Sequence, residues 1–402
     1  MEVPFLLIIH KSGEIMCKND SIKMIEKLVS FDTTSRESNL ELINFIKNYL
    51  KELNIESLLI HNEDGNKANL FATIGDPEVP GVMLSGHTDV VPVDGQNWET
   101  DPFNLTNSEG RLYGRGTSDM KSFIGIVLAQ LPKFQARGLK KPLHLAFSYD
   151  EEIGCIGVRR LIDILHTFPI KPSMCIVGEP TSMEVVIGHK GKRSYDVVVE
   201  GLEAHSSLTP SGVNAIEFAA RLINYLRELA EEFSQTGNKD DLYDVPYTTV
   251  HTGTIAGGTA LNIVPKKCDF QFEFRYIDED DPEKIESSIL EFVNNTLLPE
   301  MHKIDAKTGI QINCANEIPC LNLNPEEEVV TFVKGLAGKN QHSKVAFGTE
   351  AGLFQKRVEI PTVVCGPGDI AQAHKPNEFI EISQIKECEL FLDRLMDRIC
   401  GP

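Results

Sequence analysis

Short apolar runs alternate with amphipathic stretches through the first half of the chain. Each run has the length of one buried strand, and each amphipathic stretch repeats its apolar residues with the spacing of one helix face. The runs cover residues 69–75, 81–87, 143–149 and 173–179, and the helical stretches cover 38–53, 120–136 and 155–167, after a first helix from Asp20 or Ser21. Strands that alternate with helices favour a parallel sheet with helices on both faces. We therefore predict an α/β fold built on a mostly parallel sheet.

The pattern changes near Gly188. From 188 to 318 the order is strand, helix, strand, strand, helix, strand, which is typical of an α+β ferredoxin-like unit. A polar loop at 234–246 lies in this part, and we expect it to be mobile. The α/β rhythm resumes at about residue 319. We therefore predict a discontinuous catalytic domain of residues 1–187 and 319–402, with residues 188–318 inserted as a lid.

Four apolar runs lead into side chains that can bind a metal ion. Three of them are the runs at 81–87, 143–149 and 173–179, and the fourth is the stretch 362–373. The stretch "LHLAFSYDEEIGC" shows this most clearly, because a strand of buried type runs into three consecutive acids. Ligands of open α/β sheets gather at the carboxyl ends of strands, so side chains far apart in sequence can converge there. The strand-end candidates are His87, Asp89, Asp150, Glu151, Glu152, Glu179 and His374, and Asp119 follows a glycine-rich loop ahead of a helix.

These mostly acidic side chains would attract metal ions and repel one another. Taken singly, an acidic triplet is more often a solvated turn, and a strand-end histidine is more often structural. Here they recur in one context, and buried carboxylates repel one another unless cations neutralise them. Two imidazoles and three carboxylates suit two divalent ions with open positions. Because no thiolate is among them, zinc, cobalt and manganese all fit.

Charge and cysteine content exclude several other classes of protein. The chain has 59 acidic and 39 basic residues and a formal net charge of −20. Phosphate backbones and anionic lipids are therefore poor partners, and we expect neither nucleic acid nor membrane to bind. Nine scattered cysteines without a Cys-x-x-Cys pair indicate reduced thiols in the cytoplasm. The N-terminal run "PFLLII" is too short for a signal peptide or a bilayer span.

Six motifs occur in the order of one known family. They are "SGHTDVVPV", "GRGTSDMK", "SYDEEIG", "GEPT", "AHSS" and "GTEAG…AHKP". They resemble the dinuclear-metal amidohydrolase and peptidase family, which includes acetylornithine deacetylases, succinyl-diaminopimelate desuccinylases, aminoacylases and a glutamate-releasing carboxypeptidase. The resemblance runs from about Ser21 to the C-terminus. Residues 1 to about 19 have no counterpart in it, so they are either a real arm, or Met16 or Met24 is the start.

The resemblance implies a role for each candidate ligand. His87 and Glu179 would bind one ion, Glu152 and His374 would bind the other, and Asp119 would bridge the two. The ions would be zinc or cobalt, two for each chain.

The same resemblance assigns the remaining strand-end acids. Glu151 would be the general base and later the acid that protonates the leaving amine. Asp89 would hydrogen-bond the far nitrogen of His87 and fix its tautomer. Asp150 receives no role, and we expect it to be a solvated turn residue.

Residues outside the metal cluster are implied at the substrate end. His205 in "EAHSS" and Asn262 in "ALNIVP" would donate to the oxyanion of the tetrahedral intermediate. His205 would do so across a homodimer formed by the lid domains. Arg275 would grip a substrate carboxylate, which suits a forked guanidinium, and Glu350 would meet the substrate's amine or a water.

Within the family, the stretches "GHKGK", "FGTEAGLFQ" and "VVCGPGDIAQAHKP" are most similar to the acetylornithine deacetylases. This similarity implies hydrolysis of N2-acetyl-ornithine to acetate and ornithine in arginine synthesis. A desuccinylase, an aminoacylase or a metallopeptidase stays open as an alternative, although Glu350 argues against a succinyl substrate. A non-catalytic relative that acts as a binding subunit is a further alternative, but the base and all five ligands are present.

Overall fold

The structure is a computed structural model that describes residues 8–9, 15–16 and 21–401. The proposed N-terminal arm therefore lies mostly outside the described residues. The chain forms two compact units: unit 1 comprises residues 1–188, 323–343 and 349–402, and unit 2 comprises residues 189–322 and 344–348. Within the described ranges, no helix is both long enough and apolar enough to cross a bilayer.

The central sheet of unit 1 has the strand order β10-β17-β9-β5-β8-β4-β3. The four central strands β17, β9, β5 and β8 run parallel. β10 is antiparallel to β17, and β4 is antiparallel to β8. The edge strand β3 is antiparallel to β4. The predicted mostly parallel α/β sheet is thus present. The strands of this sheet are β3 Ser57–His61, β4 Ala68–Ile74, β5 Val82–His87, β8 Leu143–Ser148, β9 Met174–Pro180, β10 Val186–His189 and β17 Thr362–Gly366. The short strand β15 Leu321–Asn322 belongs to unit 2, and of β16 Ser343–Val345 only Ser343 belongs to unit 1.

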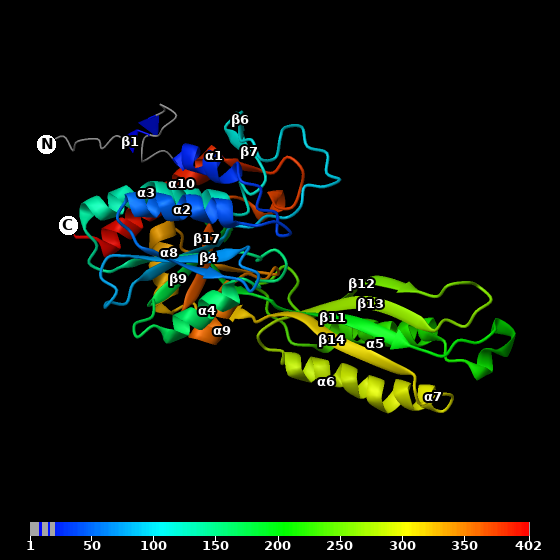
Figure 1. Cartoon of the computed structure of the whole chain (residues 1–402). Helices are drawn as coiled ribbons and strands as arrows, with labels where there is room; N and C mark the ends of the chain where they lie inside the picture. The colour runs from blue at the N-terminus through cyan, green and yellow to red at the C-terminus, as the bar shows by residue number, and fades with distance from the viewer. Residues whose placement is uncertain (1–7, 10–14, 17–20, 402) are drawn as a thin grey trace. The chain divides into compact units, whose positions relative to one another are not determined.

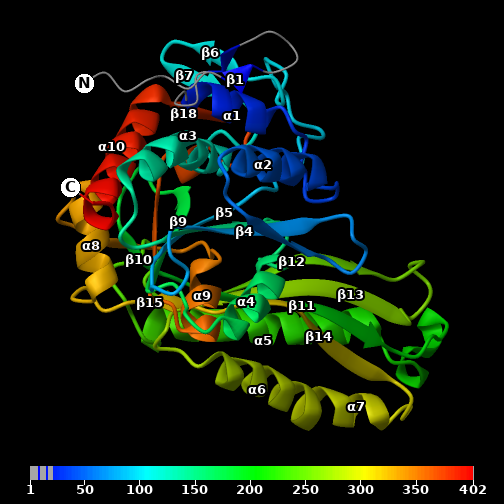
Figure 2. The ribbon, with the colours of Figure 1, turned by 60° about the vertical axis from the view of Figure 1, so that its left-hand side comes forward.

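Helices cover both faces of this sheet (Figures 1 and 2). α1, α2, α3 and α10 lie on one face, and α4 and α9 lie on the other. α8 packs against α10 and β17. The helices are α1 Ser21–Val29, α2 Leu40–Glu52, α3 Lys121–Arg137, α4 Val158–Thr167, α8 Glu328–Ala337, α9 Ala351–Val358 and α10 Ile382–Ile399. A small antiparallel sheet of β6 Thr106–Ser108, β7 Arg111–Tyr113 and β18 Phe379–Glu381 completes the unit.

The central strands are buried along their whole length, which explains their almost continuous apolar sequence. Close packing fixes the start of α3 above them. A Cβ built on Gly178 of β9 would lie 2.1 Å from the ring of Phe123, so only glycine allows this approach. The contact sets the helix start, and with it Asp119, close to the carboxyl end of β9.

Unit 2 is an antiparallel sheet in the order β12-β13-β11-β14, with α5 and α6 packed on one face (Figure 1). Its chain order β-α-β-β-α-β agrees with the predicted ferredoxin-like pattern. The helix-facing side carries an aromatic row, in which Tyr195 stacks on Phe272 at a centroid distance of 4.8 Å. The elements are β11 Gly191–Glu200, α5 Ala215–Thr236, β12 Thr249–Gly257, β13 Lys267–Tyr276, α6 Pro282–Phe292, α7 Leu298–His302 and β14 Gly309–Ile318.

Two details of unit 2 differ from the sequence prediction. The second of the two helices predicted for this part of the chain is interrupted by a π-helical turn at Val293–Leu297, close to Pro299, which cannot donate a backbone hydrogen bond. The loop at 234–246, expected to be mobile, is anchored. Asp240 forms an ion pair with Lys344 at 2.6 Å, and the side chain of Tyr243 is buried.

Candidate metal centre

The candidate ligands lie where neighbouring parallel strands end. His87 is the last residue of β5, and Glu179 lies near the end of β9. Glu151 and Glu152 follow β8, while His374 follows β17 after a short 3-10 turn at Ile370–Gln372. Because β17, β9, β5 and β8 are adjacent and parallel, their carboxyl ends bring these side chains to one edge of the sheet.

The acid side chains and the two imidazoles face one another. Nε2 of His87 lies 3.0 Å from Oδ1 of Asp119 and 3.8 Å from Oε1 of Glu179. Nε2 of His374 lies 3.0 Å from Oε2 of Glu152 and 3.5 Å from Oδ2 of Asp119. Asp119 therefore directs one oxygen to each histidine, which is the geometry that a bridging ligand needs.

Two groups of side chains place their ligand atoms within 4.8 Å of one another: His87, Glu151 and Glu179, and His87, Asp119 and Glu152. All the predicted ligands except His374 are in these groups, and His374 joins through its contacts with Glu152 and Asp119. Glu151 is itself a member of the first group, so its carboxylate is close enough to reach a water bound between these side chains. The individual roles of these residues stay a prediction.

Without a cation, burial and mutual repulsion favour the protonated forms of three glutamates in this cluster. Burial raises the pKa of Glu151 to about 8 and that of Glu152 to about 7, and neighbouring carboxylates add to both. Burial and Asp119 hold the pKa of Glu179 well above its usual value. Hydrogen bonds to Asp119 and Glu152 raise the pKa of His374 to about 10. Oxygen and imidazole donors under such repulsion fit divalent cations, which displace the extra protons.

The stability of the metal-free protein should consequently fall as the pH rises. Burial also raises the pKa of Glu350 to about 7, so Glu151, Glu152 and Glu350 all titrate above the unfolded value of about 4.5. A raised folded-state pKa gives stability that is complete below the unfolded pKa and is lost as the pH passes the folded one. We expect the chelated protein to melt about 5 °C or more lower at pH 8 than at pH 5.5.

Calorimetric melting curves of chelated and zinc-loaded protein would measure this difference. Zinc should remove most of the loss at pH 8, because the ions neutralise the same carboxylates. Glu350→Gln should raise the melting temperature of the chelated protein at pH 8 and leave it nearly unchanged at pH 5.5. A chelated protein whose melting temperature is equal at both pH values would contradict the expectation.

Asp89 supports the cluster differently from the expected contact with His87. Its carboxylate oxygen lies 3.6 Å from Nδ1 of His87, whereas its backbone carbonyl lies only 2.9 Å from that nitrogen. The carboxylate instead accepts hydrogen bonds from the backbone amides of Glu151 and Glu152 and from the hydroxyl of Ser35. Asp89 thus fixes the imidazole through its main chain and the acidic turn through its side chain.

The expectation that Asp150 is a solvated turn residue is wrong. Asp150 is 8% exposed, and its carboxylate forms a 2.6 Å ion pair with Nζ of Lys67. Lys67 also donates to the backbone carbonyl of Ser35, whose hydroxyl holds Asp89. Asp150 has a positive φ of 55°, which an aspartate tolerates better than most residues. The ion pair therefore secures the strained residue directly before Glu151.

Replacing Lys67 with Met should destabilise the protein and misplace this turn. Breaking one side of a buried ion pair costs about 3–5 kcal/mol because the other charge stays buried. Turnover should fall as well, since Glu151 and Glu152 follow Asp150 directly. Adding Asp150→Asn should recover part of the stability. Thermal unfolding and steady-state kinetics measure the two effects.

A matched ion pair serves as the control for Lys67. Lys344 and Asp240 of unit 2 have the same 2.6 Å distance and similar burial. Lys344→Met should cost comparable stability and retain turnover. If both variants lose turnover equally, the effect is general destabilisation and the ion pair has no specific role at the acidic turn.

The remaining predicted residues lie in different surroundings. Glu350 precedes α9 in unit 1, is 1% exposed, and has no hydrogen bond of ordinary geometry to either carboxylate oxygen. In unit 2, His205 and Asn262 are both exposed and adjacent, since the amide of Ser206 donates to the carbonyl of Asn262. Arg275 pairs through Nε with Glu273 at 2.9 Å. The substrate roles of these four residues stay predictions, and burial argues against direct contact by Glu350.

Several supporting residues were missed by the sequence analysis. Besides Lys67, the thiol of Cys155 donates to Oε1 of Glu151 at 3.3 Å. Glu378 is buried and accepts from the backbone amide of Asp119 at 3.1 Å. Its place two residues after the end of the last motif was the available signal, whereas Lys67 lies near no motif.

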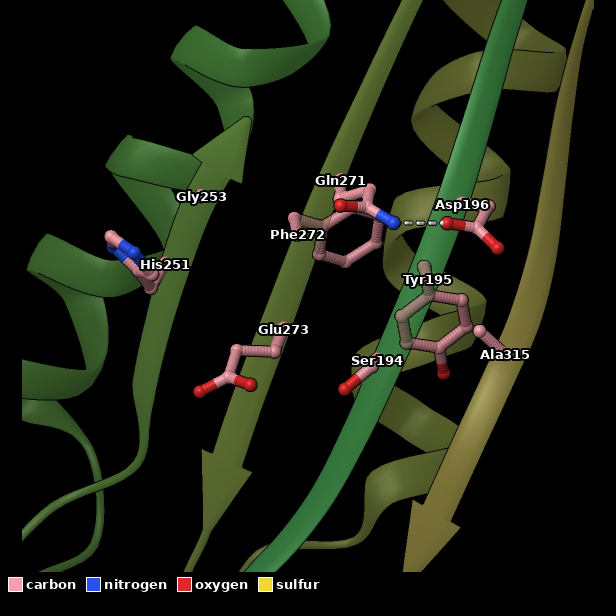
Figure 3. Close-up of a pocket in the computed structure, with 9 residues that line it drawn as sticks. All are labelled: Ser194, Tyr195, Asp196, His251, Gly253, Gln271, Phe272, Glu273 and Ala315. Atoms are coloured by element: carbon pink, nitrogen blue, oxygen red, sulfur yellow. Dashed lines mark hydrogen bonds between the residues drawn. The ribbon is translucent and has the colours of Figure 1, made fainter. Parts of the chain in front are cut away.

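A separate cavity of about 280 Å³ lies on the sheet of unit 2 (Figure 3). Gln271 donates to Asp196 across it at 2.7 Å, with Ser194 and Glu273 beside them. None of its lining residues is a candidate metal ligand. We therefore place the chemistry at the strand-end cluster of unit 1 and not in this cavity.

Comparison with known proteins agrees with the fold and the cluster. Residues 83–398 match the family described as peptidase family M20/M25/M40. The chain is 34% identical over 372 residues to an acetylornithine deacetylase of Pasteurella multocida, covering 92% of this chain and 94% of that protein.

Solved structures of low sequence identity share the fold. The aminopeptidase PepT of Bacillus cereus has a TM-score of 0.72 at 18% identity, over 94% of this chain and 98% of that one. A dinuclear metal-binding M20 peptidase of Bacillus subtilis, YXEP, has a TM-score of 0.58 at 16% identity, over 94% and 96% of the two chains. The family match and the similarity to acetylornithine deacetylases place the chain in the M20/M25/M40 family of metal-dependent peptidases and amidohydrolases.

Proposed function

We propose that this protein is a two-metal amidohydrolase that converts N2-acetyl-L-ornithine and water to acetate and L-ornithine. The observation that carries the chemistry is the geometry of Asp119, which directs one carboxylate oxygen to each of two histidines inside a buried cluster of acids. The substrate rests on the similarity to acetylornithine deacetylases over nine-tenths of the chain. We propose that this reaction serves arginine biosynthesis, and that it takes place in the cytoplasm, where the scattered cysteines would stay reduced.

The residues of unit 1 would divide the work as follows. His87 and Glu179 would hold one ion, Glu152 and His374 would hold the other, and Asp119 would bind both. We propose zinc or cobalt, which would polarise the acyl carbonyl and make the attacking water more acidic. Glu151 takes a proton from that water as its oxygen attacks the acyl carbon. Glu151 then returns the proton to the amine nitrogen as the carbon–nitrogen bond breaks.

Unit 2 would complete the site as a lid in a homodimer. His205 and Asn262 are exposed neighbours and would donate to the oxyanion of the partner's site, while Arg275 would bind the substrate carboxylate. The dimer is supported by exposed apolar side chains around one edge of unit 2, where β12 is the last strand of its sheet. These side chains are Leu208, Ile216, Ile255 and Leu261.

One substrate panel would test the proposal. Metal-reconstituted protein is assayed on N2-acetyl-ornithine, N-succinyl-diaminopimelate, N-acetyl-methionine and a small dipeptide, with and without chelator. Chelator-sensitive preference for acetyl-ornithine is the expected result. Preference for another compound would keep the chemistry and reject the substrate. Two bound ions without turnover of any compound would favour a binding subunit instead.

A further inference from the structure

A buried carboxylate connects the two loops that carry Asp119 and His374. Oε1 of Glu378 accepts from the backbone amides of Ser118 and Asp119 at 2.8 and 3.1 Å. Oε2 accepts from the amide of Gly116 at 3.0 Å and from Nη1 of Arg115 at 2.7 Å. Four donors from the 115–119 segment thus meet one side chain of the 374–378 segment. Because Glu378 is only 1% exposed, water cannot readily substitute for these bonds.

Arg115 extends the connection to His374 itself. Its Nη1 donates to the carbonyl of Lys375 at 3.3 Å, and its Nη2 donates to Oε1 of Gln96 at 2.6 Å. Gln96 in turn donates from Nε2 to the carbonyl of His374 at 3.0 Å. The same network therefore holds the carbonyl groups of His374 and of the residue that follows it.

His374 needs this backbone support more than the other candidate ligands do. Its side chain is 55% exposed, whereas that of His87 is 1% exposed. Packing cannot orient a side chain that is mostly in solvent, so its position depends on its main chain and on the acids that it faces. Its φ of 63° also places the backbone in the left-handed region, which costs energy unless neighbouring contacts hold it.

We propose that Glu378, Arg115 and Gln96 form a positioning clamp for the metal ion bound by Asp119, Glu152 and His374. The clamp sets the spacing between the Asp119 loop and the His374 loop before the ion binds. It touches neither substrate nor metal and acts only through the backbone of the ligands. The inference rests on the proposed function only in taking these three side chains as metal ligands.

The chain contains one tryptophan, and it lies on the clamp. Nε1 of Trp98 donates to Oε1 of Gln96 at 3.0 Å, and the Arg115 guanidinium lies 5.1 Å from the centre of its ring. Trp98 fluorescence therefore reports on Gln96 and Arg115 without an added label.

Zinc titration of the full-length, metal-free protein tests the clamp by calorimetry and Trp98 emission. Wild type should bind two ions, and the emission should change as the site containing His374 fills. Arg115→Met should weaken that site by about 10- to 100-fold, the range for residues that orient ligands, and weaken the other site less, because the other site shares only the bridging Asp119. Gln96→Ala should weaken the same site less and abolish the emission change. Gln96 is only partly buried, so this variant keeps the test available if Arg115→Met does not fold.

Matched residues of unit 2 serve as controls. Arg193 is likewise a buried arginine, paired with Glu286 at 2.7 Å, and Gln271 donates to Asp196 at 2.7 Å. Arg193→Met and Gln271→Ala should leave both zinc affinities unchanged. Equal weakening of both sites by Arg115→Met or Gln96→Ala, or no weakening by Gln96→Ala, would overturn the clamp. A wild type that binds two ions and hydrolyses none of the four compounds would reject the proposed function and leave the clamp standing.

Discussion

Glu151→Gln should reduce turnover by about 10²- to 10⁴-fold, the usual cost of losing a general base, while the protein keeps both metal ions. Glutamine has the shape of glutamate but cannot accept the proton of the attacking water. The backbone amide of Glu151 is held by Asp89, so the turn should stay in place. Steady-state kinetics on the preferred compound of the panel and metal analysis of the same sample measure the two quantities.

Glu152→Gln provides the contrast, because the carboxylate of Glu152 is assigned to metal binding. Nε2 of His374 lies 3.0 Å from Oε2 of Glu152, so this variant should lose an ion as well as turnover. Loss of metal by Glu151→Gln would move Glu151 into the ligand set, where its distance to His87 and Glu179 would already allow it. Retained turnover would reassign the base.

The sequence predicted those parts of the fold that depend on local periodicity. The runs that become β5, β8 and β9 are buried on both faces, so their sequences are continuously apolar and end where the sheet ends. Short edge elements such as β6, β7 and β18 have three residues each, too few to show a period. The helix α9 was also missed, because it begins within the "GTEAG" stretch, which was interpreted only as a motif.

The candidate ligands were predictable for a different reason from their supports. His87 and Glu179 lie at the ends of strands, so the apolar runs before them mark them. A support needs only to reach the site in space. Lys67 is 83 residues from Asp150, and Arg115 is 263 residues from Glu378. No periodicity links such pairs, and Asp150 was misread because its partner could not be recognised.

His205→Ala should lower turnover by about 10²- to 10³-fold, as expected for one lost oxyanion donor, without loss of metal. His205 belongs to unit 2 and the candidate ligands belong to unit 1, so the metal sites should be unaffected. His251→Ala is the matched control, because His251 is another exposed histidine of the same unit. This variant should keep the turnover of the wild type. A loss of turnover in both variants would point to damage to unit 2 as a whole.

Mixing His205→Ala with Glu151→Gln then decides which subunit supplies the imidazole. If the site is shared across a two-fold dimer, a mixed dimer combines Glu151 of one chain with His205 of the other in one of its two sites. Random exchange gives half mixed dimers, so about a quarter of wild-type turnover should return. If His205 acts within its own chain, every site in the mixture lacks one group and no activity returns. The recovered fraction, measured after subunit exchange by denaturation and refolding, therefore tests the shared site directly, because neither parent variant can supply it alone.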